Sequence, residues 1–194
     1  MKIWFDLTNS PHINFFSHVI EELESQGHEI IITCRDLANT IELVELEGWK
    51  YAEIGGHAGA SLRKKITYFP KRVFQLYRFL KKNKPDIAVS HSSFYSPITS
   101  WLLRTPSIYI NDNEHAKGNY ISFMFASKVL LPEFLKEVSK KKKWDKLSSV
   151  SFYPGTKEAL YLSKKIRKPN TRKKEINNIY IRPEPWTAQY YKGK

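Results

Sequence analysis

The first sixteen residues constrain the fold of this chain more than any other segment. An apolar run of strand length over residues 3–7 precedes the polar string Thr8-Asn9-Ser10-Pro11-His12, after which apolar residues recur at helical spacing. A buried strand that turns directly into a helix is typical of an open α/β sheet, in which ligands bind beyond the carboxyl ends of the strands. Ser10 is expected to cap this helix, and Pro11 suits its first position. The exposed amides of the first turn predict a site for an anionic or polyhydroxylated ligand.

Strand-like and helix-like segments alternate along the rest of the chain. Further strands are predicted over residues 29–33, 51–54, 86–90, 107–110, 128–131 and 150–153. Helices are predicted after an Asp36 cap and over residues 62–82, 95–103 and 120–126, the second of them broken or restarted at Pro70. This alternation predicts an α/β fold with a doubly wound, mostly parallel, Rossmann-like sheet.

The pattern changes toward the end of the chain. The lysines at 140–143 are expected in a solvated loop, and the basic stretch 164–174 indicates a linker. Residues 179–181 have the composition of another strand. We therefore expect one domain over residues 1–163, a basic linker over 164–178, and the first strand and turn of a further domain over 179–194.

Composition limits the cellular setting. The 194 residues include a single cysteine, Cys34, so no disulfide is possible within the chain, as is typical of a reducing cytosol. The sequence shows neither a signal peptide nor an apolar run of membrane-spanning length. We expect a cytoplasmic protein, with peripheral association at the inner face of the membrane as a further possibility.

Polar residues gather after four of the predicted strands, those that begin at residues 3, 51, 86 and 107. Because the carboxyl ends of parallel strands lie at one edge of a sheet, these segments are expected to converge on one pocket. The predicted substrate-binding residues are Asn9, Ser10, Gly55, Gly56, His91, Ser92, Ser93, Asn111, Asp112 and Asn113. The alternatives are ordinary local roles: Ser92 or Ser93 capping the next helix, and the glycines permitting a tight turn.

Three residues of this set are the predicted catalytic groups, namely His12, Glu114 and His115. His12 is the best candidate proton acceptor, because imidazole titrates near neutrality and a helix N-terminus favours its neutral form. No metal is expected, since the His and acidic residues lack the spacings of metal sites. Asp6, at the inner end of the first strand, either holds the loop through backbone N–H groups or positions His12, and we favour the structural role.

The net charge of +13 is concentrated in two segments. Residues 54–85 contain nine Lys or Arg and no acid, and residues 136–174 contain fourteen against three acids. Within the helix predicted over 62–82, basic and aromatic residues interleave on a face that suits an anionic membrane surface. Its membrane-facing residues are expected to be Lys64, Lys65, Lys71, Arg72 and Arg78. A solvated helix is the alternative, and nucleic acid is an unlikely partner because no reading motif accompanies the charge.

Five ordered blocks match a known family: DLTNSPHINFF, SHSSFYSP, NDNEHAKGN, YPGTKEALYL and RPEPWTAQYY. They resemble an uncharacterised prokaryotic family of predicted glycosyltransferase-like proteins. That family is similar to two-domain GT-B enzymes, among them the peptidoglycan N-acetylglucosaminyl transferase and UDP-N-acetylglucosamine 2-epimerase. Neither a dinucleotide-binding Gly-x-Gly-x-x-Gly motif nor a P-loop occurs in the sequence.

The resemblance implies that the chain is the N-terminal, acceptor-side half of a GT-B-type fold. His12 takes the place of the histidine that leads into the first helix of the transferase, and Glu114 and His115 correspond to its acid and histidine after the fifth strand. A UDP-sugar is then the expected donor substrate, with no other cofactor. Most nucleotide-sugar contacts in such enzymes come from the second domain, so a missing C-terminal domain or a second chain is the expected partner.

Three functions follow from these features. The first is an acceptor-binding half that uses His12 as general base on a hydroxyl of a glycan or lipid-linked acceptor, while Glu114, His115 and Ser92 orient the sugar. The second is an epimerase-like half, in which carboxylates abstract and return a sugar proton. The third is a non-catalytic module that binds an anionic membrane or nucleic acid.

Overall fold

The computed structural model describes residues 1–56, 62–116, 118–165 and 181, with backbone alone for 62–66 and 163–165. Within these ranges the chain forms one parallel sheet of seven strands in the order β3-β2-β1-β4-β5-β6-β7. The strands are β1 (Lys2–Leu7), β2 (Glu29–Cys34), β3 (Tyr51–Glu53), β4 (Ile87–His91), β5 (Ser107–Ile110), β6 (Lys128–Pro132) and β7 (Ser149–Tyr153). The predicted doubly wound α/β fold is confirmed. Strand order reverses between β1 and β4, which is where ligands bind in such sheets.

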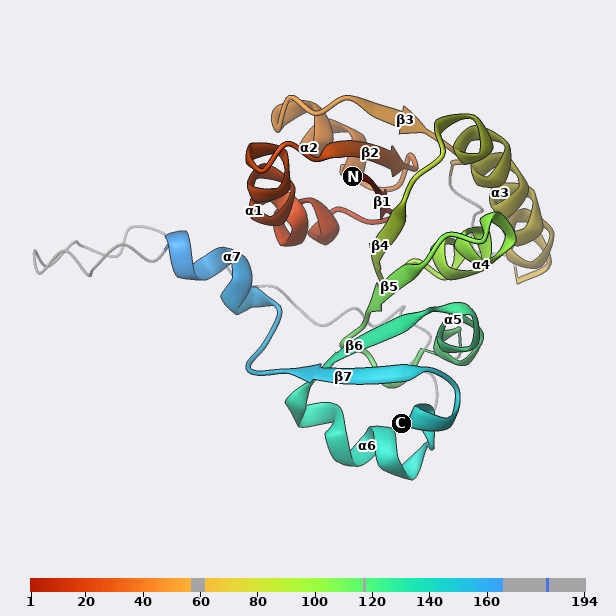
Figure 1. The fold of residues 1–194 in the computed structure, drawn as a ribbon, viewed down its shortest axis with the longest axis vertical. Helices are drawn as coiled ribbons and strands as arrows, with labels where there is room; N and C mark the ends of the chain where they lie inside the picture. Colours follow the sequence, from red (N-terminus) through yellow and green to blue (C-terminus); the bar gives the residue numbers. More distant parts are fainter. Residues whose placement is uncertain (57–61, 117, 166–180, 182–194) are drawn as a thin grey trace, which may run out of the picture.

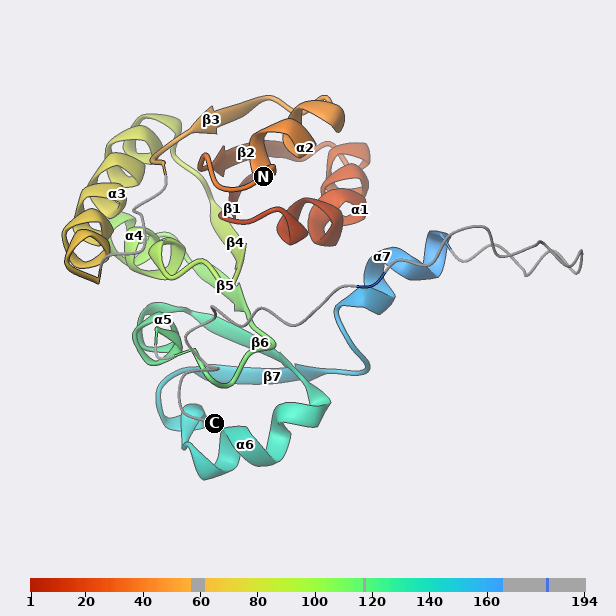
Figure 2. The ribbon, with the colours of Figure 1, turned by 180° about the vertical axis from the view of Figure 1, so that it is seen from behind.

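Helices cover both faces of the sheet (Figures 1 and 2). The helices are α1 (Pro11–Ser25), α2 (Thr40–Leu46), α3 (Leu62–Asn83), α4 (Tyr95–Leu103), α5 (Asn119–Phe125), α6 (Lys136–Lys141) and α7 (Glu158–Lys165). α1 and α2 connect β1, β2 and β3 in turn, and α3 then returns across the sheet to β4 on the opposite face, as right-handed crossovers require. α7 follows the last described strand and packs against α1.

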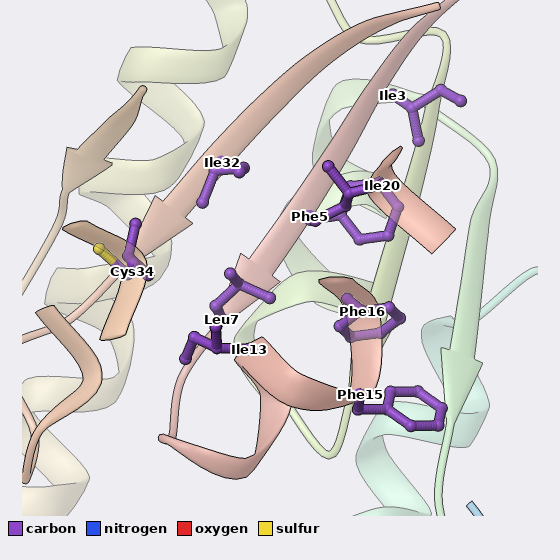
Figure 3. Packing of buried hydrophobic residues seen from close by; sticks show 10 residues of the cluster. Ile3, Phe5, Leu7, Ile13, Phe15, Phe16, Ile20, Ile32 and Cys34 are labelled. Atoms are coloured by element: carbon purple, nitrogen blue, oxygen red, sulfur yellow. The ribbon is translucent and has the colours of Figure 1, made fainter. Parts of the chain in front are cut away.

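The alternation of side chains along β1 separates the two sides of the core. Ile3, Phe5 and Leu7 pack against α1, as Figure 3 shows. Trp4 points to the other face and is buried with Leu76 and Leu80 of α3. Because both faces are covered, β1 is apolar from Ile3 to Leu7 except at Asp6.

A second apolar cluster fills the far half of the sheet. Trp144 is fully buried beside Phe123 and Tyr109, its ring 4.9 Å from that of Phe123 at nearly a right angle. Lys142 lies over the same indole ring, with its Nζ 5.3 Å from the ring centroid, and donates a hydrogen bond to the carbonyl of Glu114. The loop expected at 140–143 is therefore wrong, since Lys140 and Lys141 end α6 and Lys142 contacts the core. The expected exposure to solvent is confirmed for Lys140, Lys141 and Lys143.

Two predicted helix boundaries are also wrong. α3 continues through Pro70 without a break, because side chains before and after it are held by the fold: Phe69 stacks on Tyr95, and Val73 is buried. α2 begins at Thr40 and not at an Asp36 cap, since Ala38 adopts a left-handed conformation that a right-handed helix does not include.

The strand predicted over 179–181 and the linker beyond residue 165 lie outside the described residues, apart from the exposed Ile181. No helix in the described ranges is both long and apolar enough to cross a membrane.

Candidate functional site

His12 lies in the first turn of α1 and is almost completely buried. The backbone N–H of Thr8 donates a hydrogen bond to its Nδ1, at 3.2 Å. Because this Nδ1 is an acceptor, the neutral ring has its proton on Nε2, which is then a donor. Burial, together with the nearby charges of His91, Lys157 and Arg35, lowers the pKa of His12 to about 3, although Asp6 acts in the opposite direction. His12 is therefore a neutral hydrogen-bond donor at every physiological pH.

His91 ends β4 and lies beside His12 on the α1 side of the sheet. The two imidazole rings are 5.2 Å apart between centroids, and the ring of Phe15 lies 5.0 Å from that of His91. Both ring nitrogens of His91 are buried without a regular hydrogen-bond partner among the described residues, although Nε2 is 3.4 Å from Oδ1 of Asp112. A buried polar ring without such partners is an unusual feature that favours a ligand contact.

Asp112 and Lys157 complete this group from two further segments. Asp112 follows β5, and its Oδ2 lies 2.6 Å from the Nζ of Lys157, in the turn before α7. Burial alone would raise the pKa of Asp112, but His91 and Lys157 lower it well below its usual value, so the carboxylate is ionised. We call His12, His91, Asp112 and Lys157 the edge cluster. They come from four separate segments and meet at the carboxyl edge of the sheet.

An apolar cavity of about 460 Å³ adjoins the edge cluster between α1, α7 and the ends of β5–β7. Lys157 of the edge cluster belongs to the lining of this cavity, and so does Phe15, whose ring contacts His91. Its other lining residues are Ile110, Leu130, Tyr153, Pro154, Thr156, Ala159 and Leu160. Burial, with the charges of Asp112 and Glu158, raises the pKa of Tyr153 to about 12, so its hydroxyl stays protonated. An apolar cavity beside convergent polar groups is the usual form of a small-molecule site.

Asp6 and Arg72 form a buried ion pair on the α3 side of β1. Both side chains are fully buried, and the two Nη atoms of Arg72 donate to the two carboxylate oxygens of Asp6 at 3.0 and 2.7 Å. Thr33 and Ser93 donate to the same carboxylate. The predicted membrane-facing role of Arg72 is therefore wrong. Asp6 has the favoured structural role, through side chains rather than through backbone N–H groups, and its pKa is lowered because Arg72 and these hydroxyls outweigh burial.

The loop after β1 differs from its predicted geometry. The side chain of Ser10 does not cap α1 but donates to Oδ1 of Asn39, at 2.5 Å. The amides of His12 and Ile13 donate to the carbonyls of Asn9 and Ser10. The expected set of exposed amides is therefore wrong, because the turn satisfies them internally, while Pro11 occupies the first helical position as predicted.

The polar side chains of the loops after β4 and β5 make hydrogen bonds within the fold. Ser93 is bonded to Asp6, and the buried side chain of Asn111 bonds to Ser92 and Asn119. Neither Ser92 nor Ser93 caps α4. Oδ1 of Asn113 accepts a hydrogen bond from the backbone N–H of His115, so the side chain of Asn113 stabilises the loop after β5.

Glu114 and His115 lie on the surface of the same loop. Their Oε1 and Nε2 atoms are 3.3 Å apart, and the side chain of His115 is 65% exposed. In the described segments no three His, Cys, Asp or Glu side chains are grouped so as to hold a metal ion.

The loop after β3 has a defined need for glycine at one position. Gly55 has a φ of +81°, and a Cβ there would lie 2.1 Å from the hydroxyl of Tyr68, so any other residue would be strained. At Gly56 a Cβ would meet no atom within 4 Å. Residues 57–59 of the predicted loop lie outside the described residues.

The basic face predicted on α3 is present in part. Lys71 and Arg78 are exposed, and Arg78 lies over the exposed ring of Phe74. The side chains of Lys64 and Lys65 lie outside the described residues. Beside this face, an apolar groove of about 440 Å³ separates α3 from α4. It is lined by Phe69, Pro70, Val73, Phe74, Tyr77, Ile98 and Leu102.

Sequence analysis missed two charged residues at this edge, Lys157 and Arg35. Arg35 directly follows β2, and its Nε donates to the carbonyl of Thr8 at 2.9 Å. Both follow a predicted strand, as the other candidates do: Arg35 follows the strand predicted over 29–33, and Lys157 the strand predicted over 150–153. The arrangement as a whole offers neutral donors, an ionised carboxylate and cations beside an apolar cavity, which suits a polyhydroxylated or phosphorylated ligand.

Sequence comparison identifies a family. The model of a family described as "Protein of unknown function (DUF354)" matches residues 1–194. The uncharacterized protein MJ0665 of Methanocaldococcus jannaschii is 33% identical over 133 residues, which cover 68% of this chain and 39% of that protein. The chain thus spans well under half the length of this relative.

Structural comparison shows which proteins share the fold. The MnaA–UDP complex of S. aureus aligns with a TM-score of 0.65 over 87% of this chain and 48% of its own, at 13% identity. The UDP-GlcNAc 2-epimerase of Methanocaldococcus jannaschii gives 0.62 over 84% and 48%, at 15% identity. MurG of Acinetobacter baumannii gives 0.56 over 68% and 40%, at 15% identity. The chain therefore has the α/β fold of GT-B-type proteins, as the resemblance implied.

Proposed function

The chain belongs to the DUF354 family, and we propose that it is the acceptor-binding half of a glycosyltransferase-like protein. In this proposal the protein acts on a nucleotide sugar and a glycan or lipid-linked acceptor. A nucleotide-binding domain, in the same or a second chain, completes the enzyme. The convergence of His12, His91, Asp112 and Lys157 at the strand-order reversal is the observation that supports the proposal.

The edge cluster would bind the sugar, and the cavity beside it would take an apolar part of the acceptor. Asp112 is ionised and can accept sugar hydroxyls, while the Nε2–H of His12 can donate to a sugar oxygen. A general base at Nε2 of His12 would instead need its proton on Nδ1 and the loss of the bond from Thr8. We therefore propose that His12 binds through Nε2–H. The surface pair Glu114 and His115 would orient the ligand at the rim of the site.

Two variants of His12 separate the donor role from the base role. His12→Gln keeps an N–H donor near the position of Nε2, whereas the shorter side chain of His12→Asn can place its oxygen near Nδ1 but no donor near Nε2. Isothermal titration of the full chain with UDP-GlcNAc and with octyl β-N-acetylglucosaminide should show binding within about threefold of wild type for His12→Gln and at least tenfold weaker binding for His12→Asn.

Further variants test the cluster itself. His91→Ala and Asp112→Ala should each weaken the sugar ligand at least tenfold, while His28→Ala, at the opposite edge of the sheet, should have no effect. Equal affinities in all five variants would contradict the proposed site. An epimerase-like function is the alternative, and it would show itself as incorporation of solvent deuterium at C2 of UDP-GlcNAc without an acceptor.

We also propose that the surface formed by α3, α4 and α5 contacts an anionic membrane. These helices lie side by side (Figures 1 and 2). Large apolar side chains on them are unusually exposed, among them Phe74, Trp101 and Met124, each 59% exposed. Lys71 and Arg78 flank them, and each such cation near an anionic surface contributes about 1 kcal/mol.

Vesicle co-sedimentation tests this surface. The full chain should bind phosphatidylcholine vesicles in which about a third of the lipid is phosphatidylglycerol, because this lipid gives the vesicles an anionic surface. Added salt should release the chain from the vesicles. Trp101→Ser and the pair Lys71→Glu with Arg78→Glu should each reduce binding at least fivefold. Lys128→Glu is the matched control, because Lys128 is exposed at the start of β6. Equal loss in the control would indicate a response to net charge alone and contradict the proposed surface.

A further inference from the structure

Arg35 occupies a position between two loops that the sequence predicts to bind ligand. It follows Cys34, which pairs with Leu7 of β1 on one side and Glu53 of β3 on the other. Arg35 therefore lies between the loop that begins at Thr8 and the turn at Gly55. Its Nε–H is fixed by the carbonyl of Thr8.

The guanidinium of Arg35 has no counter-ion within the described part of the chain. Its two Nη atoms make no hydrogen bond there, and no carboxylate is at ion-pair distance. The charge of Asp6 acts on Arg35, but four donors from Arg72, Thr33 and Ser93 already occupy the two oxygens of this carboxylate. Arg35 is thus a cation in excess at this edge.

The surroundings of Arg35 hold the side chain in place and partly remove it from water. The ring centroid of Tyr95 is 6.0 Å from Cζ of Arg35 and 4.4 Å from Cζ of Arg72, so one aromatic ring contacts both guanidinium groups. Burial, and to a lesser degree the charge of Arg72, lowers the pKa of Arg35. A partly buried guanidinium that is held in place and has no counter-ion among the described residues is suited to bind an anion.

We propose that Arg35 binds phosphoryl oxygens of a ligand that lies beside Thr8 and the turn at Gly55. A guanidinium presents paired N–H donors that match phosphate geometry, and the two Nη atoms of Arg35 have no hydrogen bond to the described residues. The proposal deepens the proposed function and rests on it for the molecule that supplies the phosphate. Two sources share this chemistry: the diphosphate of a nucleotide sugar and the phosphate of a lipid-linked acceptor.

The test uses the full chain, with UDP as a probe of the first source and octyl phosphate as a probe of the second. Arg35→Gln should weaken binding of the probe from the correct source at least tenfold, and Arg35→Lys should give an intermediate loss. Arg104→Gln is the matched control, because Arg104 is exposed at the opposite edge, between α4 and β5. Failure of both probes to bind the wild type, or a loss no greater than in the control, would overturn the proposal.

A second measurement does not depend on a variant. Phenylglyoxal modification followed by mass spectrometry should show Arg35 labelled at least fivefold more slowly in the presence of the probe that binds, with Arg104 unaffected. Unchanged labelling of Arg35 would overturn the proposal. If sugar binding at His91 and Asp112 persists while the effects at Arg35 are absent, this inference alone fails. If Arg35 is protected while sugar binding is absent, the proposed function alone fails.

Discussion

Single residues at the carboxyl edge of the sheet divide between the two faces of β1. On the α1 side, His12 and His91 belong to the edge cluster with Asp112 and Lys157. On the α3 side, Asp6 and Arg72 form a buried pair in which all three nitrogens of Arg72 and both oxygens of Asp6 make hydrogen bonds within the fold. The first group has polar atoms that can bind a ligand, because both ring nitrogens of His91 lack a regular partner among the described residues. The second group holds together β1, β2, α3 and the loop after β4.

The Asp6–Arg72 pair predicts a specific pattern of stabilities. Arg72→Met and Asp6→Asn should each lower the free energy of unfolding by about 3–5 kcal/mol, because each leaves an uncompensated buried group. The double variant Asp6→Leu with Arg72→Met should lose clearly less than the sum of the two. Urea denaturation followed by circular dichroism measures all three. Strict additivity, or a loss under about 1 kcal/mol in the single variants, would show that the pair is not buried as described.

His12 predicts a dependence of stability on pH. Its pKa in the folded protein is about 3, against an ordinary value of 6.5, so between these values the unfolded chain binds the extra proton. The stability that His12 contributes is complete above pH 6.5 and falls by about 1.4 kcal/mol per pH unit as the pH decreases below it. The urea concentration at the midpoint of unfolding should decrease for wild type as the pH is lowered from 7 to about 4.5, a range roughly above the titration of carboxylates. For His12→Gln the decrease should be less steep. Parallel declines would contradict this account of His12.

The sequence allowed some of these residues to be identified and not others. His12, His91 and Asp112 were predicted because each follows an apolar strand, and parallel strands bring such positions together. Arg72 was assigned to the surface by its recurrence with Lys71, although a step of one residue turns a helix by about 100° and places neighbours on different faces. Only the three-dimensional partner, Asp6, determines which of the two basic residues is buried.

At the level of helices and strands, α7 is attached to the sheet through the edge cluster and α1. The ion pair between Lys157 and Asp112 and the contact of α7 with α1 hold this helix over the cavity. Lys157→Met should therefore increase amide hydrogen exchange in α7 at least tenfold while leaving the central strands unchanged. Lys140→Met, which removes an exposed pair with Glu137, is the control and should leave α7 unaffected. Equal exchange in α7 for both variants would mean that Lys157 does not hold the helix.

Strands were predicted more accurately than helix ends, for a physical reason. Strands such as β1 and β4 are buried on both faces, so their apolar runs are visible in the sequence. The start of α2 depends on the left-handed conformation of Ala38, a residue with no special tendency to adopt it. The continuity of α3 through Pro70 depends on packing against Tyr95, which no local pattern contains.

In the whole molecule, the two proposed functions use separate surfaces. The edge cluster and Arg35 lie at the carboxyl edge of the sheet, while the exposed apolar and basic side chains of α3, α4 and α5 lie along one face of the sheet. This separation would let the protein bind a membrane without covering the sugar site. The chain spans less than half the length of each of the three compared structures. The nucleotide-binding domain that completes the enzyme is therefore a proposal.

The imidazole signals of the chain provide the most direct test of the central claim, that the edge cluster is a sugar-binding site. UDP-GlcNAc can be titrated into isotope-labelled protein while the histidine side chains are followed by NMR. We predict saturable shifts for His12 and His91, with His18 on the outer part of α1 and His28 at the opposite edge unchanged. If His12 and His91 do not respond, or if all four histidines shift alike, the ligand does not bind at this edge of the sheet.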